Sequence, residues 1–326
     1  MLPITVAAAP RMSRRSLLGA LGATTLAGAA APAFLASPAA AAGAGRGYGL
    51  FLPSYPGSID SVRVAGEAVG RAPELVMWYA AWSTGGAFPL AQVQEVSAAG
   101  AVPEITWEPW DPALGTAQTR FSMASIASGR HDVYVKAWAR AAAAWGGAVR
   151  LRFAHESNGP WYPWSVGVAG TTSRGYVAAW RRVVTIFRNA GARNVRFVWC
   201  PNVPFAGTPA LASIYPGDAY VDAVGLDGYN WGTSQDWSTW GSFTDVFGAG
   251  VAELRTLTTK PLVIGEVGCA EDGGDKAAWI TDMFAVLAAH PEISGFTWFN
   301  VAKEADWRVE STQASLDAFR AGVAGA

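Results

Sequence analysis

Residues 149–200 decide the fold, and they read VRLRFAHESNGPWYPWSVGVAGTTSRGYVAAWRRVVTIFRNAGARNVRFVWC. An apolar run over residues 149–155 ends in polar and turn-forming residues. A segment with apolar residues at spacings of three and four follows over 174–189, and a second apolar run comes after it over 195–200. Spacings of three and four indicate a helix, so this order predicts a strand, a helix and a second, parallel strand.

The same alternation continues along the chain in both directions. Eight apolar or aromatic runs are predicted to be strands: 48–55, 75–82, 102–107, 149–155, 195–200, 223–230, 261–267 and 293–299. The predicted helices follow them over 62–69, 90–98, 133–145, 174–189, 243–257, 276–288 and 313–321. The segment after the fifth run, 209–215, is short, so its helix is expected to be degenerate.

Eight strands that alternate with helices predict a single α/β domain, a (β/α)8 TIM barrel whose parallel sheet closes on itself. The alternative is an open, doubly wound sheet, which would carry a Gly-rich phosphate loop after the first strand. Residues 55–58, YPGS, are not such a loop. Because active sites of barrels lie at the carboxyl ends of the strands, the residues that end each strand are the candidates for function.

The N-terminal segment is predicted to be an export signal. Arg14 and Arg15 form a twin arginine, an Ala/Gly/Leu-rich stretch follows to Leu35, and residues 40–42 are a run of alanines suited to cleavage. We therefore expect a twin-arginine signal peptide over 1–42, a catalytic domain over 43–326 and a secreted, extracellular protein. A transmembrane anchor is the alternative, but Ala and Gly make a weakly apolar helix.

Composition excludes several classes of partner and cofactor. A net charge of −1 in 326 residues gives no electrostatic reason to expect nucleic acid or an acidic membrane surface as a partner. The two cysteines, Cys200 and Cys269, follow non-adjacent predicted strands, which favours free thiols over a disulfide. With three histidines a zinc site is not expected. We expect a monomer without metal or cofactor.

Two glutamates stand out among the carboxylates. Glu156 follows the fourth predicted strand and Glu266 lies near the end of the seventh, on opposing parts of the barrel rim. Cleavage of a glycosidic bond needs one acid to protonate the leaving oxygen and a second carboxylate to attack the sugar or activate water. The pair therefore predicts a glycosidase. The alternative is that each glutamate is an ordinary rim carboxylate paired with an arginine.

Aromatic and polar residues near the same strand ends suit a sugar cleft. Many of the 16 tryptophans end or follow strands, including Trp82, Trp107, Trp161 and Trp298, and indole rings stack on the C–H faces of sugars. For each tryptophan, core packing is the alternative. Further candidates for contact with substrate or with the glutamates are Glu108, Arg152, His155, Asn202, Asp227 and Tyr229. Arg152 shares strand parity with Glu156, and a buried arginine needs a carboxylate partner.

These stretches resemble glycoside hydrolase family 26, over about residues 47–320. The strongest element is RFAHESNGPWYPW at 152–164; IGEVG at 264–268, GLDGYNW at 225–231 and FTWFN at 296–300 are also similar. The resemblance implies a retaining enzyme with Glu156 as acid/base and Glu266 as nucleophile. It implies that Tyr229 contacts the nucleophile, that Trp298 is the aromatic floor beneath the attacked sugar, and that His155 stands where related families carry Asn.

The run WYPW at 161–164 bears on the substrate. Well-known β-mannanases of the family carry Trp-Phe-Trp-Trp here, whereas this run resembles the branch that includes mixed-linkage β-glucanases. The expected substrate is a β-1,4-mannan or a β-1,3-1,4- or β-1,4-glucan, as polysaccharide or oligosaccharide. A non-catalytic carbohydrate-binding barrel and a transglycosylase acting on β-glycans are the competing hypotheses.

Overall fold

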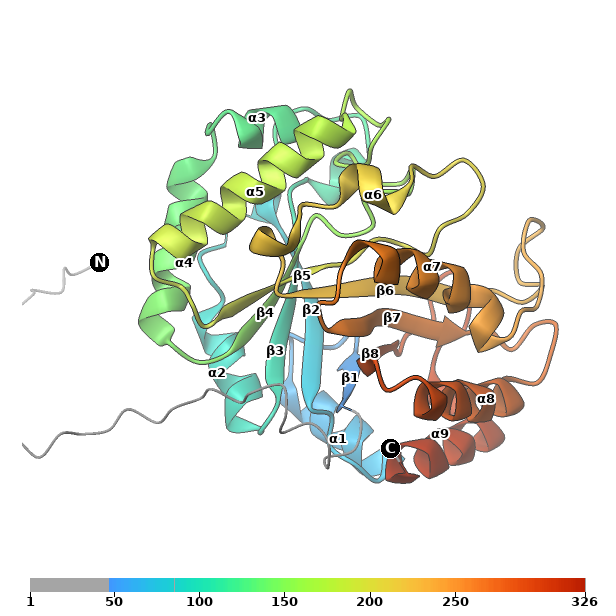
Figure 1. Ribbon diagram of the computed structural model, residues 1–326. Coiled ribbons are helices and arrows are strands. Elements are labelled where there is room, and N and C mark those ends of the chain that lie inside the picture. The colour runs from blue at the N-terminus through green and yellow to red at the C-terminus, as the bar shows by residue number, and fades with distance from the viewer. Residues whose placement is uncertain (1–46, 85, 326) are drawn as a thin grey trace, which may run out of the picture. The chain divides into compact units, whose positions relative to one another are not determined.

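The computed structural model describes residues 47–84 and 86–325, and within them eight parallel strands close into a barrel (Figure 1). The strands are β1 (Gly47–Phe51), β2 (Leu75–Ala81), β3 (Val102–Glu108), β4 (Val149–Phe153), β5 (Val195–Trp199), β6 (Ala223–Asn230), β7 (Leu262–Cys269) and β8 (Ile293–Phe299). Each pairs with its neighbours in sequence, and β8 pairs with β1. The predicted barrel is confirmed, and the open sheet is wrong.

Helices connect the strands and lie outside them (Figure 1). They are α1 (Ile59–Val69), α2 (Leu90–Ala98), α3 (Met123–Ala127), α4 (Asp132–Trp145), α5 (Ser173–Asn189), α6 (Leu211–Ile214), α7 (Phe243–Leu257), α8 (Lys276–Ala289) and α9 (Gln313–Gly325). The degenerate helix after the fifth strand is confirmed as the single turn α6. The short helix α3, between β3 and α4, was not predicted.

Local sequence explains where several helices begin and end. Ser242 and Asp245 form a reciprocal capping box at the start of α7, and Thr172 caps α5 through the amide of Gly175. Gly146 ends α4 in the left-handed conformation, at φ 78°, which glycine adopts without strain.

The two faces of each strand enter different environments. On β3, the side chain of Trp107 points outward and stacks on Trp138 of α4, with ring centroids 4.6 Å apart. Glu104, on the inward face of the same strand, pairs with Arg150 of β4 at 2.7 Å inside the barrel. The outer layer between strands and helices is the main apolar core, while the interior carries buried charge. This polar interior is what places charged groups beneath the barrel mouth.

Of the predictions about the chain as a whole, the structure bears on the state of the two cysteines. The export signal predicted for 1–42 lies outside the described residues. Cys200 and Cys269 are both buried and both free, as the strand placement favoured. Across residues 47–84 and 86–325, no helix combines the length and apolar character needed to cross a membrane.

Candidate active site

Glu156 is delivered to the barrel mouth by a tight turn at the end of β4. Ala154 and Glu156 both have left-handed backbone angles, with φ of 46° and 49°, which cost non-glycine residues roughly 1 kcal/mol or more each. The neighbouring strands hold this turn: the Ala154 amide donates to the Trp107 carbonyl at 3.1 Å, and the Glu156 amide donates to the Cys200 carbonyl at 2.8 Å. These two hydrogen bonds therefore offset the cost of the strained backbone and fix the position of Glu156.

The loop after Glu156 is locked to the loop after β5. The side-chain amide of Asn158 donates to the Asn202 carbonyl at 2.8 Å, and its oxygen accepts from the Asn202 amide at 2.9 Å. The side chain of Asn202, predicted to bind sugar, instead donates to the Val203 carbonyl at 2.7 Å. In this structure Asn202 therefore organises the loops, and its predicted contact with sugar stays a prediction.

Glu266 is reached by donors from three strands. Its Oε1 accepts from the Tyr79 hydroxyl on β2 at 2.6 Å and from the Arg152 guanidinium on β4 at 3.0 Å. Its Oε2 accepts from the Tyr229 hydroxyl on β6 at 2.5 Å, which confirms the predicted contact of Tyr229 with this carboxylate. These three hydrogen bonds fix the orientation of the Glu266 carboxylate.

Arg152 links Glu266 to a second carboxylate, that of Asp227, its register partner on β6. The guanidinium is fully buried and pairs with both Glu266 and Asp227, which confirms its predicted inward direction and its need for a carboxylate partner. Asp227 also accepts from the Cys200 thiol at 3.1 Å. A side chain at position 265 would bring its Cβ to within 2.6 Å of an Asp227 oxygen, so Gly265 is required there.

Glu156 is set in a different environment from Glu266. Within the described part of the chain one side-chain hydrogen bond reaches it, from the indole of Trp161 to Oε2 at 2.6 Å. Burial, together with the negative charge of Glu266, raises the pKa of Glu156 to about 8, against the weaker opposing effect of the Trp161 bond. At neutral pH this group is therefore protonated, as an acid that delivers a proton must be.

Glu108 is a third carboxyl group in the same environment. It ends β3, is buried, and burial raises its pKa to about 8, with a smaller contribution from Glu266. Its charge also influences the pKa of Glu156. The structure thus places Glu108 near both predicted catalytic groups, and its predicted contact with sugar stays a prediction.

His155 is buried beside these groups, and its ring packs near Tyr79 and Tyr162. Burial, and secondarily the charge of Arg152, hold its pKa well below the ordinary range. Donor atoms of His155, Asp227 and Glu266 all lie within 4.8 Å of one another, a cluster that resembles a metal site. The oxygens of both carboxylates, however, are already engaged by Arg152 and its neighbours, so a cation would have to bind beside a fixed positive charge. We assign no metal to it.

Among the four tryptophans predicted to bind substrate, Trp161 lies against a catalytic candidate. It contacts Glu156 and stacks on Phe205, with centroids 5.9 Å apart, and both rings are partly exposed. Trp82 and Trp107 are buried against each other, at 4.8 Å, in the layer between strands and helices. The contacts of Trp82 and Trp107 therefore do not support the prediction that they line the site.

Trp298 also faces away from the barrel interior. Its ring packs on Phe319 of α9 with centroids 5.3 Å apart, and its indole donates to the Trp307 carbonyl at 2.8 Å. The structure thus corrects the prediction of an aromatic floor at Trp298. Strand alternation is the physical reason, because Trp298 and Phe299 point to opposite faces of β8, and Phe299 packs on Tyr79 and Tyr229 near Glu266.

Sequence reasoning missed three residues of this site. Tyr79 donates to Glu266, Cys200 donates to Asp227, and Trp307 packs on Tyr229 with centroids 5.0 Å apart. Alternation on β2 could have found Tyr79, since Leu75, Met77 and Tyr79 share one face. Trp307 lies in a loop, where no periodic signal exists.

Comparison with known proteins identifies a family for this chain. The family model described as glycosyl hydrolase family 26 matches residues 115–281. Endoglucanase H of Acetivibrio thermocellus is 36% identical over 282 residues, which cover 84% of this chain and 30% of that protein. The chain thus spans about a third of the length of the curated relatives it matches first, the second being mannan endo-1,4-β-mannosidase A and B of Caldalkalibacillus mannanilyticus, of which 31% is covered.

Solved structures share the fold. The family 26 β-mannanase from Bacteroides ovatus superimposes with a TM-score of 0.62 at 19% identity, over 87% of this chain and 89% of that one. The catalytic domain of the Bacillus sp. JAMB-750 endo-β-1,4-mannanase gives 0.64 at 20% identity, over 85% of each chain. At this low sequence identity, the two structures show that the fold is shared and nothing further. The family model matches more than half of this chain, which shows that the chain belongs to glycosyl hydrolase family 26.

Proposed function

We propose that this chain is a retaining endo-β-glycosidase that hydrolyses a β-linked polysaccharide, with Glu266 as nucleophile and Glu156 as acid/base. One observation carries the proposal: the two glutamates have opposite surroundings at one barrel mouth. Three donors orient the Glu266 carboxylate, whereas burial raises the pKa of Glu156 and so keeps its proton in place. A double displacement needs one carboxylate of each kind.

The reaction follows from these two states. A Glu266 oxygen attacks the anomeric carbon while Glu156 transfers its proton to the departing sugar oxygen, which leaves a glycosyl ester on Glu266 and a negative charge on Glu156. Glu156 then takes a proton from the entering water, whose oxygen displaces Glu266. Both groups return to their starting states. Because Glu266 becomes neutral in the ester, its charge no longer raises the pKa of Glu156 during the second step.

We further propose a β-1,4- or β-1,3-1,4-glucan as substrate, with β-1,4-mannan as the second candidate. The relative at 36% identity is named as an endoglucanase, whereas a relative named as a mannosidase is 26% identical over 181 residues. The run WYPW at 161–164, which carries the Glu156 contact, supports the same order. Transfer to a sugar in place of water would use the same intermediate.

The test is release of reducing sugar from barley β-glucan, cellulose, glucomannan, mannan and β-1,3-xylan. Wild-type protein is compared with Glu156→Gln and Glu266→Gln, and with Glu67→Gln on the exposed face of α1 as the control. We expect activity on β-glucan that both site variants lose and the control keeps. Activity that persists in both site variants would overturn the assigned roles, and binding without sugar release would indicate a carbohydrate-binding barrel.

The stereochemical outcome tests the mechanism independently of rate. Proton NMR of the first products should show the β-anomer, since two displacements retain configuration. The α-anomer would contradict a nucleophilic Glu266. Added acceptor sugar separates hydrolysis from transglycosylation through the length of the products.

We also propose that residues 1–42 direct export through the twin-arginine route. The support is the Arg14-Arg15 pair and the cleavage-like run at 40–42. A double substitution of Arg14 and Arg15 to Lys should leave the protein inside an expressing bacterial cell, while the wild-type chain is exported. Export of both proteins alike would contradict it.

A further inference from the structure

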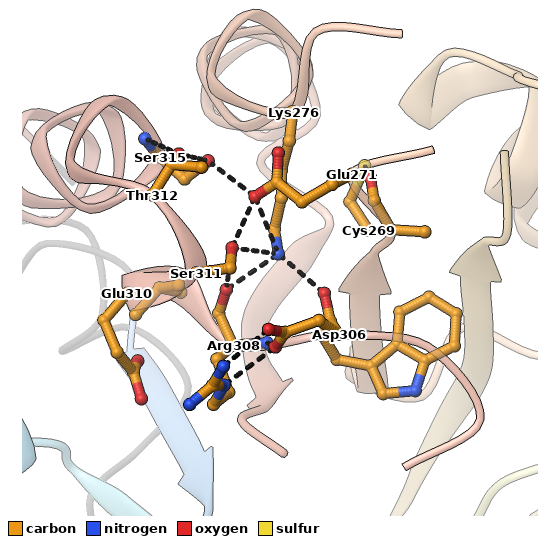
Figure 2. A network of polar contacts seen from close by, with 12 residues as sticks. Cys269, Glu271, Lys276, Asp306, Arg308, Glu310, Ser311, Thr312 and Ser315 are labelled. Carbon is orange, nitrogen blue, oxygen red and sulfur yellow. Dashed lines mark hydrogen bonds and ion pairs between the residues drawn. The ribbon is translucent and has the colours of Figure 1, made fainter. Parts of the chain in front are cut away.

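A lysine lies fully buried at the start of α8. The ammonium of Lys276 donates to the Asp306 carbonyl at 2.9 Å, the Arg308 carbonyl at 2.7 Å and the Ser311 hydroxyl at 2.8 Å, and the Glu271 carboxylate lies 3.6 Å away (Figure 2). A buried ammonium is costly unless its charge and its three protons are matched. Here each proton has an acceptor, and Glu271 supplies the opposite charge.

The oxygens around Lys276 have the composition of a cation site. Two main-chain carbonyls, a hydroxyl and a carboxylate are the ligands that proteins offer to hard cations such as Ca²⁺. Glu271 is itself oriented by hydrogen bonds from Ser311 and, at 3.4 Å, from Ser315 of α9. The lysine therefore takes the place that a bound cation would hold in such a site.

This network holds the connection between β8 and α9, residues 300–312. Lys276 contacts the connection at Asp306, Arg308 and Ser311 (Figure 2). In the sequence, Asp306 and Arg308 lie directly before and after Trp307. Because Lys276 belongs to α8 and Glu271 follows β7, the connection is fastened to a different part of the barrel. Its own internal bonds, such as Val309 amide to the Asn300 side chain at 2.8 Å, do not supply that attachment.

The fastened segment reaches the catalytic carboxylate through two aromatic rings. Trp307 is buried and packs on Tyr229 with centroids 5.0 Å apart, and edge-on to Trp231 at 4.8 Å. Tyr229 in turn donates to Glu266. A continuous series of contacts thus joins Lys276, the backbone on either side of Trp307, the Trp307 ring, Tyr229 and Glu266.

We propose that Lys276 is a positioning residue which substitutes for a bound cation: its ammonium fixes the β8–α9 connection so that Trp307 holds Tyr229 against Glu266. The proposal rests on the proposed function, because it assigns Lys276 a role in the reactivity of the nucleophile. It concerns a residue that does not touch the substrate.

The test compares Lys276→Ala, Lys276→Met and the control Lys136→Met, which changes an exposed lysine on α4. Rates on barley β-glucan are expressed per folded molecule, from circular dichroism. We expect kcat to fall about tenfold in both Lys276 variants, because the hydrogen bond from Tyr229 to the charged Glu266 is then no longer held in place. The kcat of Lys136→Met should be unchanged. Propylammonium, which replaces the atoms missing in Lys276→Ala, should restore kcat in that variant, whereas neutral 1-propanol should not.

Two outcomes would overturn the proposal. One is a wild-type kcat in the folded fraction of Lys276→Ala, which would mean that Lys276 stabilises the fold but does not affect the nucleophile. The other is a lowered kcat that propylammonium does not raise above the 1-propanol level. Lys276→Met fills the same volume and should show no rescue by either compound. If Lys276→Ala does not fold, Ser311→Ala is measured instead. The proposal predicts that its kcat falls about threefold, and a wild-type kcat in this variant would contradict the proposal.

A further readout separates this proposal from the proposed function. Trypsin should cut the Lys276→Ala connection after Lys303 or Arg308 faster than it cuts the wild type, with protection by propylammonium. If the wild type releases sugar from none of the glycans, the proposed function fails, and the trypsin pattern still reports whether Lys276 holds the connection. Equal cutting in both proteins would contradict the fastening role.

Discussion

The two glutamates at the barrel mouth differ in how the fold supports them. Glu266 accepts hydrogen bonds from Tyr79, Tyr229 and Arg152, on three other strands. Glu156 accepts one side-chain bond, from Trp161 five residues further along its own loop. Long-range hydrogen bonds thus orient Glu266, the group that must stay charged in the reaction. Burial instead sets the pKa of Glu156, the group that must give up and regain a proton.

The backbone repeats this difference. Glu266 lies in the strand β7, where the pairing with β6 and with β8 shifts register close to it. Glu156 lies beyond its strand, in a left-handed conformation held by the carbonyl of Cys200, the residue directly after β5. One group is fixed by side chains and the other by main chain, so substitutions of side chains should separate them clearly.

Removing each carboxylate gives the largest expected effect. Glu266→Ala should lower kcat/KM by about 10⁴- to 10⁶-fold, as loss of a nucleophile does, and Glu156→Ala by about 10²- to 10⁴-fold, as loss of a general acid does. Azide should partly restore Glu156→Ala by attacking the glycosyl-enzyme, with a β-glycosyl azide as product. In Glu266→Ala, azide would attack the substrate directly and yield the α-product. Chromatography and NMR distinguish the two azides, and the reverse assignment would exchange the roles.

Much of this arrangement could be predicted from sequence, because it depends on periodicity. All eight strands were predicted, but Glu266 lies within β7, which continues to Cys269, and Glu156 lies three residues beyond the end of β4. Arg152 was predicted to point inward from its parity, and the structure shows it paired with Glu266. A strand has a period of two, so parity along one strand is reliable information.

What could not be predicted depends on contacts between distant segments. Trp298 was placed at the site by resemblance, yet its ring packs on α9, and Trp307, in an aperiodic loop, approaches Tyr229 instead. Tyr79 meets Glu266 because the sheet closes between β8 and β1, which leaves two strands between β7 and β2. Side-chain direction beyond a strand end depends on loop geometry, which the hydrophobic pattern does not encode.

Substitution of Arg152 should remove the ion pairs that hold Glu266 and Asp227 and leave the position of Glu156 unchanged. Arg152→Met leaves two carboxylates buried without their cation, so the free energy of unfolding should fall by about 3–5 kcal/mol. The matched control is Arg196→Met on β5, an exposed partner of Asp222 at 3.5 Å, which should cost less than about 1 kcal/mol. Urea denaturation measures both. Similar losses in the two variants would show that the buried pairing contributes little.

The two tyrosines test which hydrogen bond to Glu266 contributes more to catalysis. Tyr79 shares Oε1 with Arg152, whereas Tyr229 is the sole side-chain donor to Oε2 among the described residues. A hydrogen bond to a charged group contributes about 1.5–3 kcal/mol, so Tyr229→Phe should lower kcat/KM by about 10- to 150-fold. Tyr79→Phe should cost less, because Arg152 still holds Oε1. Steady-state kinetics on β-glucan give both values, and a larger loss in Tyr79→Phe would reverse the order.

The smallest expected effect belongs to Trp161, and it concerns pH. Glu156 must carry its proton in the first step, and its pKa of about 8 lies far above the ordinary value, so kcat/KM should fall as pH rises through about 8. The Trp161 indole donates to the ionised carboxylate and so lowers that pKa. Trp161→Phe removes the donor, which raises the pKa and moves the alkaline limb upward. Because Trp161 is 40% exposed, we expect a shift of up to about one pH unit. A downward shift would mean that the lost indole mainly opened Glu156 to water, so that burial, rather than the hydrogen bond, is what Trp161 provides.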